Sequence, residues 1–509
     1  MNTSDTIVAP ATAPGGAIAV IRVSGSDAIA LCGTVFWPLK AMVVQRDANE
    51  EVAADSAETP GKTESALGAT VGALAAAKGY TLHYGTIVDG ERVIDQVLVS
   101  LFRAPRSYTG EDMVEISCHG SPYIRAEIVR LLVERGARPA GPGEFTVRAF
   151  LAGKMDLSQA EAVADTIAAE ERASHALASN QMRGGYSADL ARLRARLVEL
   201  ASLLELELDF AEEDVNFADR RELRQAVEEI AERIDALLSS FRVGNAIKEG
   251  VTVAIVGDAN VGKSTLLNRL LHDERAMVSQ IAGTTRDTLE ERLTIDGTLF
   301  RLIDTAGIRP TEDTLELMGI ERSLSAAHRA RIVLLVCDMS AARDDASLAR
   351  EIAALNLRSD QQLCIVLNKA DLGGPSITMP TAMPIASGAS TASAAATALP
   401  GEAAGYPAIA LSAKTGTGID RLTAWLSAST GVEAVYGGDT VLSNSRHVEA
   451  LTRAREALTR VEEGIAATLP TDLLTQELRQ AIHHIGTITG QITTDEILGE
   501  IFSRFCIGK

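Results

Sequence analysis

The sequence predicts a multidomain chain in which an N-terminal α+β domain precedes a helical domain, and an inserted α/β domain of the P-loop class interrupts that helical domain. Three observations support this prediction. Short β-branched runs fill the first 155 residues, apolar stripes of helical spacing lie on both sides of the middle of the chain, and the middle opens on Val251-Thr-Val-Ala-Ile-Val-Gly-Asp-Ala-Asn-Val-Gly-Lys-Ser264. At 509 residues the chain is long enough for about three domains of ordinary size.

Strands predominate in the N-terminal part. Residues 86–93 predict a hairpin that turns at Asp89-Gly90, because an Asp-Gly pair between apolar residues favours a two-residue turn. Residues 41–79 are rich in Ala, Glu, Thr and Gly and lack periodicity, so we expect a flexible insertion there. Further strands are predicted at 6–9, 17–23 and 113–116.

Helical periodicity dominates both sides of the middle domain. Ser158 and Glu161 have the spacing of a capping box at a helix start, and Thr493 and Glu496 repeat it before the last helix. Apolar side chains recur at steps of three and four, which predicts the core seams of a helical bundle. These stripes are Leu190, Leu193, Leu197, Leu200 and Leu204, then Leu223, Val227, Ile230, Ile234, Leu237 and Phe241, then Val448, Leu451, Ala454, Leu458, Val461 and Ile465.

The middle of the chain alternates apolar strands with helical segments, as a doubly wound sheet does. Gly373–Gly405 is rich in Ala, Ser, Thr and Pro, and we expect a mobile surface insertion there. Because the termini of a compact domain often lie close together, the flanking helices can form one domain that hosts the insert. The strands are predicted at 251–256, 299–303, 332–336, 364–367 and 408–411. The predicted domains are 1–155, 156–248 with 432–509, and 249–431.

Composition excludes several classes of protein. The net charge of −20 argues against broad nucleic-acid binding, which requires concentrated Lys and Arg, so an RNA substrate would need a local patch or a partner protein. Five scattered cysteines argue against a disulfide framework or a zinc ribbon and fit a reducing compartment. We find no apolar run of about 18 residues and no secretion signal, so we expect a cytoplasmic protein without a membrane span.

The order of strand, glycine-rich loop and helix at residues 251–270 is the arrangement that phosphate binding requires. The glycines let backbone N–H groups close around phosphate oxygens, and the helix N-terminus adds its positive end. Lys263 is placed to reach the terminal phosphates, and the Ser264 hydroxyl is placed to bind Mg²⁺. The complete Gly-x-x-x-x-Gly-Lys-Ser pattern in this context makes a chance turn a poor explanation.

Three shorter motifs follow at predicted strand ends. Asp304-Thr-Ala-Gly307 offers a carboxylate for Mg²⁺ and a peptide N–H for a γ-phosphate. Asn368-Lys-Ala-Asp371 offers a carboxylate that can accept the two N–H groups of a guanine edge, which adenine does not present. Ser412-Ala-Lys414 can brace that pocket. Each motif alone fits an ordinary turn, but four motifs in this order favour GTP over ATP.

The same order resembles the translation-factor-like GTPases of the Era type. Gly283-Thr-Thr-Arg-Asp287 matches their switch stretch, and 304–323 resembles the tRNA-modification GTPase family MnmE, also called TrmE. Phe505-Cys-Ile-Gly-Lys509 matches the C-terminal motif of that family, and Thr6-Ile-Val-Ala-Pro-Ala-Thr-Ala-Pro-Gly15 matches its start. The resemblance covers nearly the whole chain and fails only in the two insertions.

The resemblance implies a folate-binding N-terminal domain, a discontinuous helical domain and an inserted Ras-like G domain. It implies a homodimer that joins the flavoprotein MnmG in a heterotetramer and contacts tRNA through that complex. The implied function is GTP hydrolysis in the addition of a carboxymethylaminomethyl group to the wobble uridine of certain tRNAs. The implied cofactors are Mg²⁺, K⁺ and a tetrahydrofolate derivative.

The family's functional residues can be placed on this sequence. By resemblance, folate contacts fall on Arg22, Glu115 and Lys154, with Lys509 near the same site, although Arg22 and Lys154 also fit solvated surface charges. Cys506 is expected near that site, with a buried small hydrophobe or an inert thiol as alternatives. The predicted GTP contacts are Asn260, Val261, Gly262, Lys263, Ser264, Thr265, Ser279, Gln280, Ile281, Ala282, Gly283, Thr284, Thr285, Asp304, Thr305, Ala306, Gly307, Asn368, Lys369, Ala370, Asp371, Ser412, Ala413 and Lys414.

Hydrolysis requires a group that orients the attacking water, and Ile308 stands where many GTPases carry a Gln. By resemblance, Glu316 orients the water, and K⁺ takes about the place of an arginine finger. Glu316 alternatively fits an ordinary exposed carboxylate. The implied catalytic residues are Glu316 and Lys263, and the implied metal ligands are Ser264 and Thr285 for Mg²⁺ and Asn260, Ser279, Ile281 and Thr284 for K⁺.

Two other functions fit parts of the sequence. A regulatory GTPase of ribosome assembly would share the nucleotide motifs, but it would favour a KH-like C-terminal appendage, and no Gly-x-x-Gly loop stands in a basic helical setting there. A pure folate-binding scaffold would leave the nucleotide motifs unexplained. The chain also departs from the family pattern at Ala259, where Pro is frequent, and near Gly15-Gly16, where many members carry an Arg.

Overall fold

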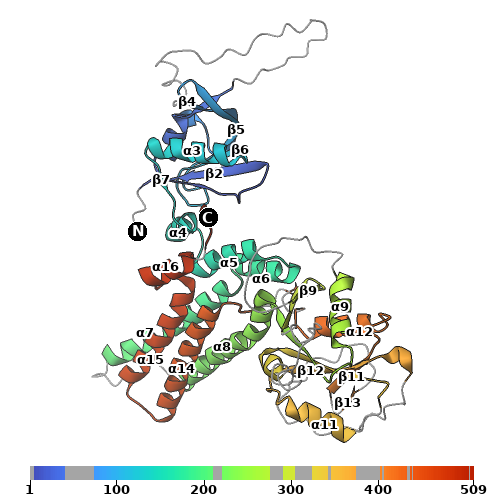
Figure 1. Ribbon diagram of the computed structural model, residues 1–509. Helices are drawn as coiled ribbons and strands as arrows, with labels where there is room; N and C mark the ends of the chain where they lie inside the picture. Colours follow the sequence, from blue (N-terminus) through green and yellow to red (C-terminus); the bar gives the residue numbers. More distant parts are fainter. Residues whose placement is uncertain are drawn as a thin grey trace, which may run out of the picture. The chain divides into compact units, whose positions relative to one another are not determined.

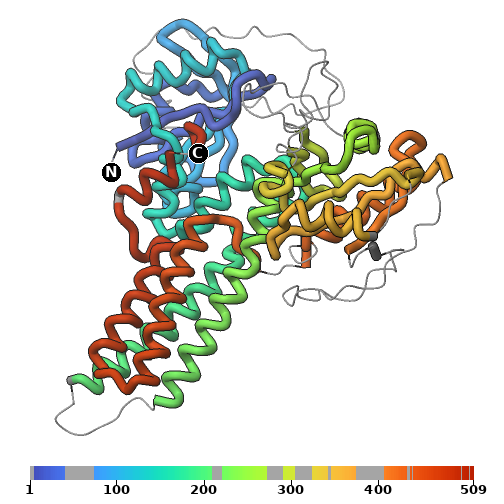
Figure 2. The backbone as a smooth tube through the Cα atoms, turned by 60° about the horizontal axis from the view of Figure 1, so that its bottom comes forward, coloured from blue at the N-terminus to red at the C-terminus, as the bar shows by residue number. Residues whose placement is uncertain are grey.

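The computed structural model forms two compact units, Met1–Ala164 with Gly486–Lys509, and Asp165–Ile485 (Figure 1, Figure 2). None of the described helices is both long and apolar enough to cross a membrane. The described residues are 5–39, 74–209, 220–274, 291–303, 324–341, 345–373, 402–403, 406–432, 436–437, 440–503 and 505–509.

The first unit is built on a seven-stranded sheet of order β3-β4-β5-β6-β2-β1-β7. Its strands pair antiparallel, except that β1 and β7 are parallel. β4 and β5 meet at the predicted Asp89-Gly90 turn, and both strands run further than predicted. The strands are β1 (Ile7–Pro10), β2 (Ile18–Ser24), β3 (Phe36–Pro38), β4 (Thr81–Asp89), β5 (Arg92–Phe102), β6 (Met113–His119) and β7 (Arg138–Pro139).

One face of this sheet is buried under α1 (Ala28–Gly33) and α3 (Pro122–Glu134). Alternate strand residues such as Val99 and Ile116 pack there against Leu131 of α3. Leu74 is 1% exposed and belongs to the same core, so the predicted insertion at 41–79 is wrong at its C-terminal end. The rest of that prediction lies outside the described residues. The unit also contains α4 (Glu144–Leu151) and α16 (Asp495–Ser503).

Two helix caps lie one or two residues from their predicted positions. α5 (Leu157–Ala168) begins with a capping box in which Gln159 N donates to the Asp156 carboxylate at 2.8 Å and Asp156 N donates to Gln159 Oε1 at 2.9 Å. The Ser158 hydroxyl donates to the Asp156 carboxylate at 2.8 Å. α16 is capped by Thr494 and not by the preceding threonine, since Ile497 N donates to the Thr494 hydroxyl at 3.3 Å.

The second unit combines a bundle of long helices with a second sheet. The predicted stripes are buried in the bundle, as shown by Leu197 and Ile234, both 0% exposed. Phe241, Val448 and Ile465, at the ends of two stripes, are only half-buried. The bundle helices are α6 (Arg172–Met182), α7 (Gly185–Asp209), α8 (Arg220–Glu249), α14 (Ser445–Ala466) and α15 (Thr471–Thr489).

The second sheet has seven strands in the order β13-β14-β12-β11-β8-β10-β9. β10, β8, β11, β12 and β14 run parallel, and the two edge strands are antiparallel to their neighbours. Every strand predicted from an apolar run is present, whereas β9 and β13 were not predicted. The strands are β8 (Val251–Val256), β9 (Glu291–Ile295), β10 (Thr298–Ile303), β11 (Ile332–Asp338), β12 (Gln362–Asn368), β13 (Glu402–Ala403) and β14 (Tyr406–Ala410).

The two strands that were missed have different explanations. β9 alternates polar and apolar residues, so it lacks a continuous apolar run, but the Asp296-Gly297 turn that follows it is a hairpin signal that could have revealed it. β13 lies within Gly373–Gly405, so the expected mobile insertion is wrong at 402–403, where the chain pairs with β14. Residues 374–401 lie outside the described part of the chain.

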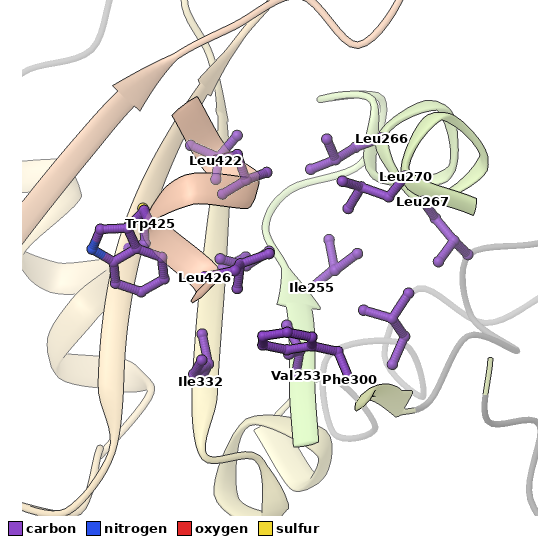
Figure 3. Close-up of a cluster of buried hydrophobic side chains, with 14 of the residues drawn as sticks. Val253, Ile255, Leu266, Leu267, Leu270, Phe300, Ile332, Leu422, Trp425 and Leu426 are labelled. Atoms are coloured by element: carbon purple, nitrogen blue, oxygen red, sulfur yellow. The ribbon is translucent and has the colours of Figure 1, made fainter. Parts of the chain in front are cut away.

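Helices cover both faces of this sheet, and β8 sends alternate side chains to opposite faces. Val253 belongs to the core on one face, with Leu266 and Trp425 (Figure 3), while Ala254 belongs to the core on the other face, with Leu348. Burial on both faces explains why β8 is apolar at every position except Thr252. The covering helices are α9 (Lys263–Glu274), α11 (Asp345–Ala354) and α12 (Ile419–Ala428).

Candidate nucleotide site and N-terminal pocket

The phosphate loop connects the end of β8 to the start of α9. Gly257 has a φ of 140°, and a Cβ added there would lie 2.2 Å from the Val336 carbonyl oxygen of β11. Gly262 has a φ of 97°, and its added Cβ would lie 2.3 Å from the Asn368 amide nitrogen. Both positions therefore require glycine for the folded backbone itself, in addition to the close approach that phosphate binding needs.

Lys263 is half-buried in the first turn of α9. Its Nζ donates to the carbonyl oxygens of Gly257 and Asp258 at 2.7 and 2.6 Å. Burial lowers the pKa of the Lys263 ammonium from its ordinary value. The loop therefore holds a cation beside the N–H groups of α9, which is the setting for an anion. Ser264 is half-buried next to it, and Thr265 is exposed.

Asn368 joins the phosphate loop to the loops at the ends of β12 and β14. Its side chain is 3% exposed. Nδ2 donates to the Val261 carbonyl at 2.8 Å, and Oδ1 accepts from Ala413 N at 2.9 Å. One buried amide thus brings together three of the four stretches that the sequence assigned to nucleotide binding.

Asp371 lies in the short 3₁₀ helix η4 (Ala370–Leu372), exposed and beside Ser412. The Ser412 hydroxyl donates to Asp371 Oδ1 at 2.6 Å, and Thr415 N donates to the Ser412 hydroxyl at 3.2 Å. The Ser412 hydrogen bond lowers the pKa of Asp371, so the carboxylate remains an acceptor. Ala370 is half-buried and Lys414 is exposed near this loop.

Asp338, the last residue of β11, was not predicted to belong to the site. Its Oδ2 accepts from Lys369 Nζ at 2.6 Å. The hydrogen bond from Lys369 lowers the pKa of Asp338 to about 2. A carboxylate at the end of an apolar strand is a weak signal alone, and only the pairing of β11 with β12 brings it to Lys369.

Part of the predicted site lies outside the described residues. Asn260, one expected K⁺ ligand, is described and is exposed with a φ of 62°. The predicted site residues beyond the described ranges are Ser279, Gln280, Ile281, Ala282, Gly283, Thr284, Thr285, Asp304, Thr305, Ala306, Gly307 and Glu316.

The hairpin of β9 and β10 is joined to the start of α6. Thr294 Oγ1 donates to Glu171 Oε1 at 2.7 Å, and Ala173 N donates to the Gly297 carbonyl at 3.0 Å. Glu171 also forms a capping box with Ser174 at the start of α6. The hairpin that separates residues 279–285 from Asp304 is therefore fixed to a helix of the bundle.

The first unit contains a pocket of about 450 Å³ on the sheet face opposite α1 and α3. Glu115 and Lys154, two of the predicted folate contacts, line it. Lys154 Nζ donates to the Pro105 carbonyl. The sequence did not single out the aromatic part of the wall. The remaining lining residues are Tyr80, Phe102, Arg106, Ser107, Tyr108 and Met113.

Arg22 lies beside this pocket and ties it to the C-terminus. It forms an ion pair with Glu115 at 2.8 Å, and its guanidinium lies 5.1 Å from the centre of the Tyr108 ring. Its Nη1 donates to the Gly508 carbonyl at 3.3 Å, next to the half-buried Lys509. The structure thus brings the four predicted folate contacts to one region of this unit.

Cys506 is the exposed cysteine of this chain. Its carbonyl accepts from Gly143 N at 3.4 Å, and the next residue, Ile507, bridges to Pro142. The other cysteines, Cys32, Cys118, Cys337 and Cys364, are buried. The exposed Cys506 thiol excludes the buried alternative, and a chemical role for it stays a prediction.

Comparison with known proteins identifies the family. The model of the MnmE helical domain matches residues 157–506, and the model of the GTP-binding protein TrmE N-terminus matches residues 6–154. The chain belongs to the MnmE family. The tRNA modification GTPase MnmE of Christiangramia forsetii is 46% identical over 100% of both chains, and that of Flavobacterium johnsoniae is 43% identical over 100% of both. Among solved structures, the G domain of the T. maritima FeoB iron transporter is similar at 20% identity with a TM-score of 0.21. The match covers 35% of this chain and 97% of the FeoB chain.

Acid should weaken the nucleotide domain of this MnmE-family chain at Asp338. The pKa of Asp338 is lowered from 3.8 to about 2 in the folded chain. The Lys369 contact therefore stabilises the fold fully when the pH is above the pKa of the unfolded chain, and this stabilisation is lost as the pH falls toward 2. We expect Asp338→Asn to flatten the stability profile between about pH 5 and pH 2. Equilibrium unfolding of the nucleotide-free protein measures this, and parallel curves for variant and wild type would contradict it.

Proposed function

We propose that this chain is a GTP hydrolase that, with a flavoprotein partner of the MnmG kind, adds a carboxymethylaminomethyl group to the wobble uridine of certain tRNAs. Its family is that of the tRNA modification GTPases, which favours this function over a switch in ribosome assembly. The observation that carries the nucleotide part is the buried Asn368 amide, because it joins the phosphate loop to the loop of the expected guanine acceptor.

Each loop has its own task in the proposed GTP site. Backbone N–H groups at the start of α9 and Lys263 bind the phosphates, and Asp371 accepts the N1–H and 2-amino groups of guanine. Ser412 holds the Asp371 carboxylate in one orientation. Ser264 and Thr285 would hold Mg²⁺, which neutralises charge on the β- and γ-phosphates when bound.

Asp371→Asn should weaken GTP binding about tenfold or more and shift base preference toward xanthine, because an amide N–H then stands where guanine also presents a donor. Equilibrium titration of the variant with guanosine and xanthosine diphosphates measures both effects. An unchanged preference for guanine would contradict the assignment of Asp371.

For hydrolysis, we propose that Glu316 orients the attacking water and that Asn260, Ser279, Ile281 and Thr284 hold K⁺. A cation near the bridging phosphate oxygens stabilises the charge that develops there. The support is the family resemblance, the exposed left-handed Asn260 in the phosphate loop and the absence of a Gln at Ile308. The K⁺ loop is expected to close when two G domains meet.

GTP hydrolysis should be faster in K⁺ than in Na⁺ at equal ionic strength, and Glu316→Ala should reduce the K⁺ rate by about 100-fold or more. Phosphate release measured in matched KCl and NaCl buffers checks both, with nucleotide affinity as the control for intact binding. Equal rates in the two salts, or a fully active Glu316→Ala protein, would contradict this mechanism.

For the N-terminal pocket, we propose a tetrahydrofolate derivative as ligand, which would supply the one-carbon unit. The pocket carries the types of side chain that such a molecule requires. Aromatic side chains offer faces for a pterin ring, Glu115 offers an acceptor for pterin N–H groups, and Arg22, Lys154 and Lys509 offer cations for a glutamate tail.

Glu115→Gln should weaken binding of 5-formyltetrahydrofolate about tenfold, because the amide cannot accept from two pterin donors as the carboxylate does. Glu134→Gln, an exposed glutamate of α3 paired with Arg130, is the matched control and should bind normally. Calorimetric titration measures this. Equal affinity of the two variants would remove Glu115 from the site.

The proposed homodimer has a suitable surface on the sheet of the first unit. Leu82, Tyr84 and Leu98 are 62%, 50% and 41% exposed on the face opposite α1 and α3, and Tyr84 is paired directly with Leu98. Neighbouring exposed apolar side chains of this kind mark an association surface. With a net charge of −20, the chain is proposed to contact tRNA through the complex with its partner.

Tyr84→Lys should shift the protein toward monomer, because it places a charge in that apolar surface. Tyr123→Lys is a matched control, since Tyr123 is 58% exposed on α3, which covers the other face of the sheet. Sedimentation velocity measures the oligomeric state. A Tyr84→Lys protein that remains as dimeric as the Tyr123→Lys protein would contradict the choice of surface.

A further inference from the structure

Within the described residues, Asp338 contacts one side chain outside its own turn, that of Lys369. Its Oδ2 accepts from Lys369 Nζ at 2.6 Å, while its Oδ1 accepts from the backbone N and the hydroxyl of Ser340 at 2.9 and 2.6 Å. The Asp338 side chain is 19% exposed and that of Lys369 is 31% exposed. The carboxylate is therefore oriented by Ser340 in its own turn as well as by Lys369.

The backbone holds the two partners in register. Asp338 is paired with Asn368 in the ladder of β11 and β12, and Met339 N donates to the Asn368 carbonyl at 2.8 Å. Lys369 then adopts a left-handed conformation with a φ of 66°, which is unfavourable for a residue other than glycine. A residue in such a conformation persists where its surroundings hold it, and the ion pair to Asp338 is one such restraint.

Lys369 is also a potential competitor at the base-reading carboxylate. It stands two residues before Asp371 in the same loop. Its charge helps to lower the pKa of that carboxyl, after the hydrogen bond from the Ser412 hydroxyl and the charge of Lys414. A lysine ammonium released from Asp338 would have Asp371 as a nearby acceptor. If the two paired, the Asp371 oxygens would be occupied and unavailable to guanine N–H groups.

We propose that Asp338 is a positioning residue for base recognition, which keeps the Lys369 ammonium away from Asp371. This inference rests on the proposed guanine-nucleotide site. It adds a specificity determinant that lies outside the four nucleotide motifs. Removing the Asp338 charge should therefore affect the guanine-specific part of binding, beyond any loss of stability.

The experiment compares affinities for guanosine and inosine diphosphate, since inosine lacks the 2-amino group that Asp371 is proposed to accept. Asp338→Asn should lower the ratio of the two affinities about tenfold. Adding Lys369→Met should restore much of the ratio, because methionine keeps an apolar stem and removes the competing charge. Asp360→Asn, which breaks the exposed pair with Arg358 before β12, is the matched control and should leave the ratio unchanged.

The outcomes separate this inference from the proposed function. If Asp371→Asn lowers the ratio and Asp338→Asn does not, Asp338 has no role in base recognition. A low ratio in Asp338→Asn that Lys369→Met fails to restore would show a structural effect only and would overturn the inference. If Asp371→Asn itself leaves the ratio unchanged, the proposed guanine site fails first. Thermal unfolding of each nucleotide-free variant controls for folding.

Discussion

The buried amide of Asn368 is the contact on which the nucleotide domain depends. It accepts from Ala413 N and donates to the Val261 carbonyl, so it holds the phosphate loop, the β12 loop and the β14 loop together. Loss of either bond would leave a buried polar group unsatisfied, which costs about 1–3 kcal/mol. The same amide leaves no room for a side chain at Gly262, so the glycine of one motif and the asparagine of another constrain each other.

The next constraint lies in the hairpin between the predicted metal-binding stretch 279–285 and the Asp304-Thr-Ala-Gly307 motif. β9 starts at Glu291 and β10 ends at Ile303, next to Asp304. The hairpin is hydrogen-bonded to the start of α6 through Thr294 and Gly297. The helical bundle is therefore hydrogen-bonded directly to the hairpin that links the predicted stretch 279–285 to Asp304.

Much of this arrangement could be predicted from the sequence, because the apolar runs and the glycine loop are local signals. β8 follows from its apolar run, and the helical stripes follow from their periodicity. The capping box of α5 was misplaced because two acceptable patterns overlap, and the Asp156 carboxylate with Gln159 prevailed over Ser158. The pair of Asp338 and Lys369 could not be predicted, since it depends on the register between two strands that are distant in sequence.

The N-terminal pocket shows the same limit. Glu115 and Lys154 were expected from a family pattern, whereas Tyr80 and Phe102 come to the pocket from strands β4 and β5 and their flanks, and only the folded sheet brings them beside Glu115. The contact from Arg22 to the Gly508 carbonyl likewise joins the two ends of the chain. Contacts between segments so far apart in sequence produce no periodic pattern in either segment, so they could not be predicted from the sequence.

The most direct test of this account is the affinity of Asn368→Ala for guanosine diphosphate, compared with that of Asn268→Ala, an exposed asparagine of α9. Asn368 is held to organise the phosphate loop and the base-reading loops together. We therefore predict that Asn368→Ala loses about 100-fold or more in affinity while Asn268→Ala binds as wild type does. A folded Asn368→Ala protein that binds guanosine diphosphate with wild-type affinity would contradict it.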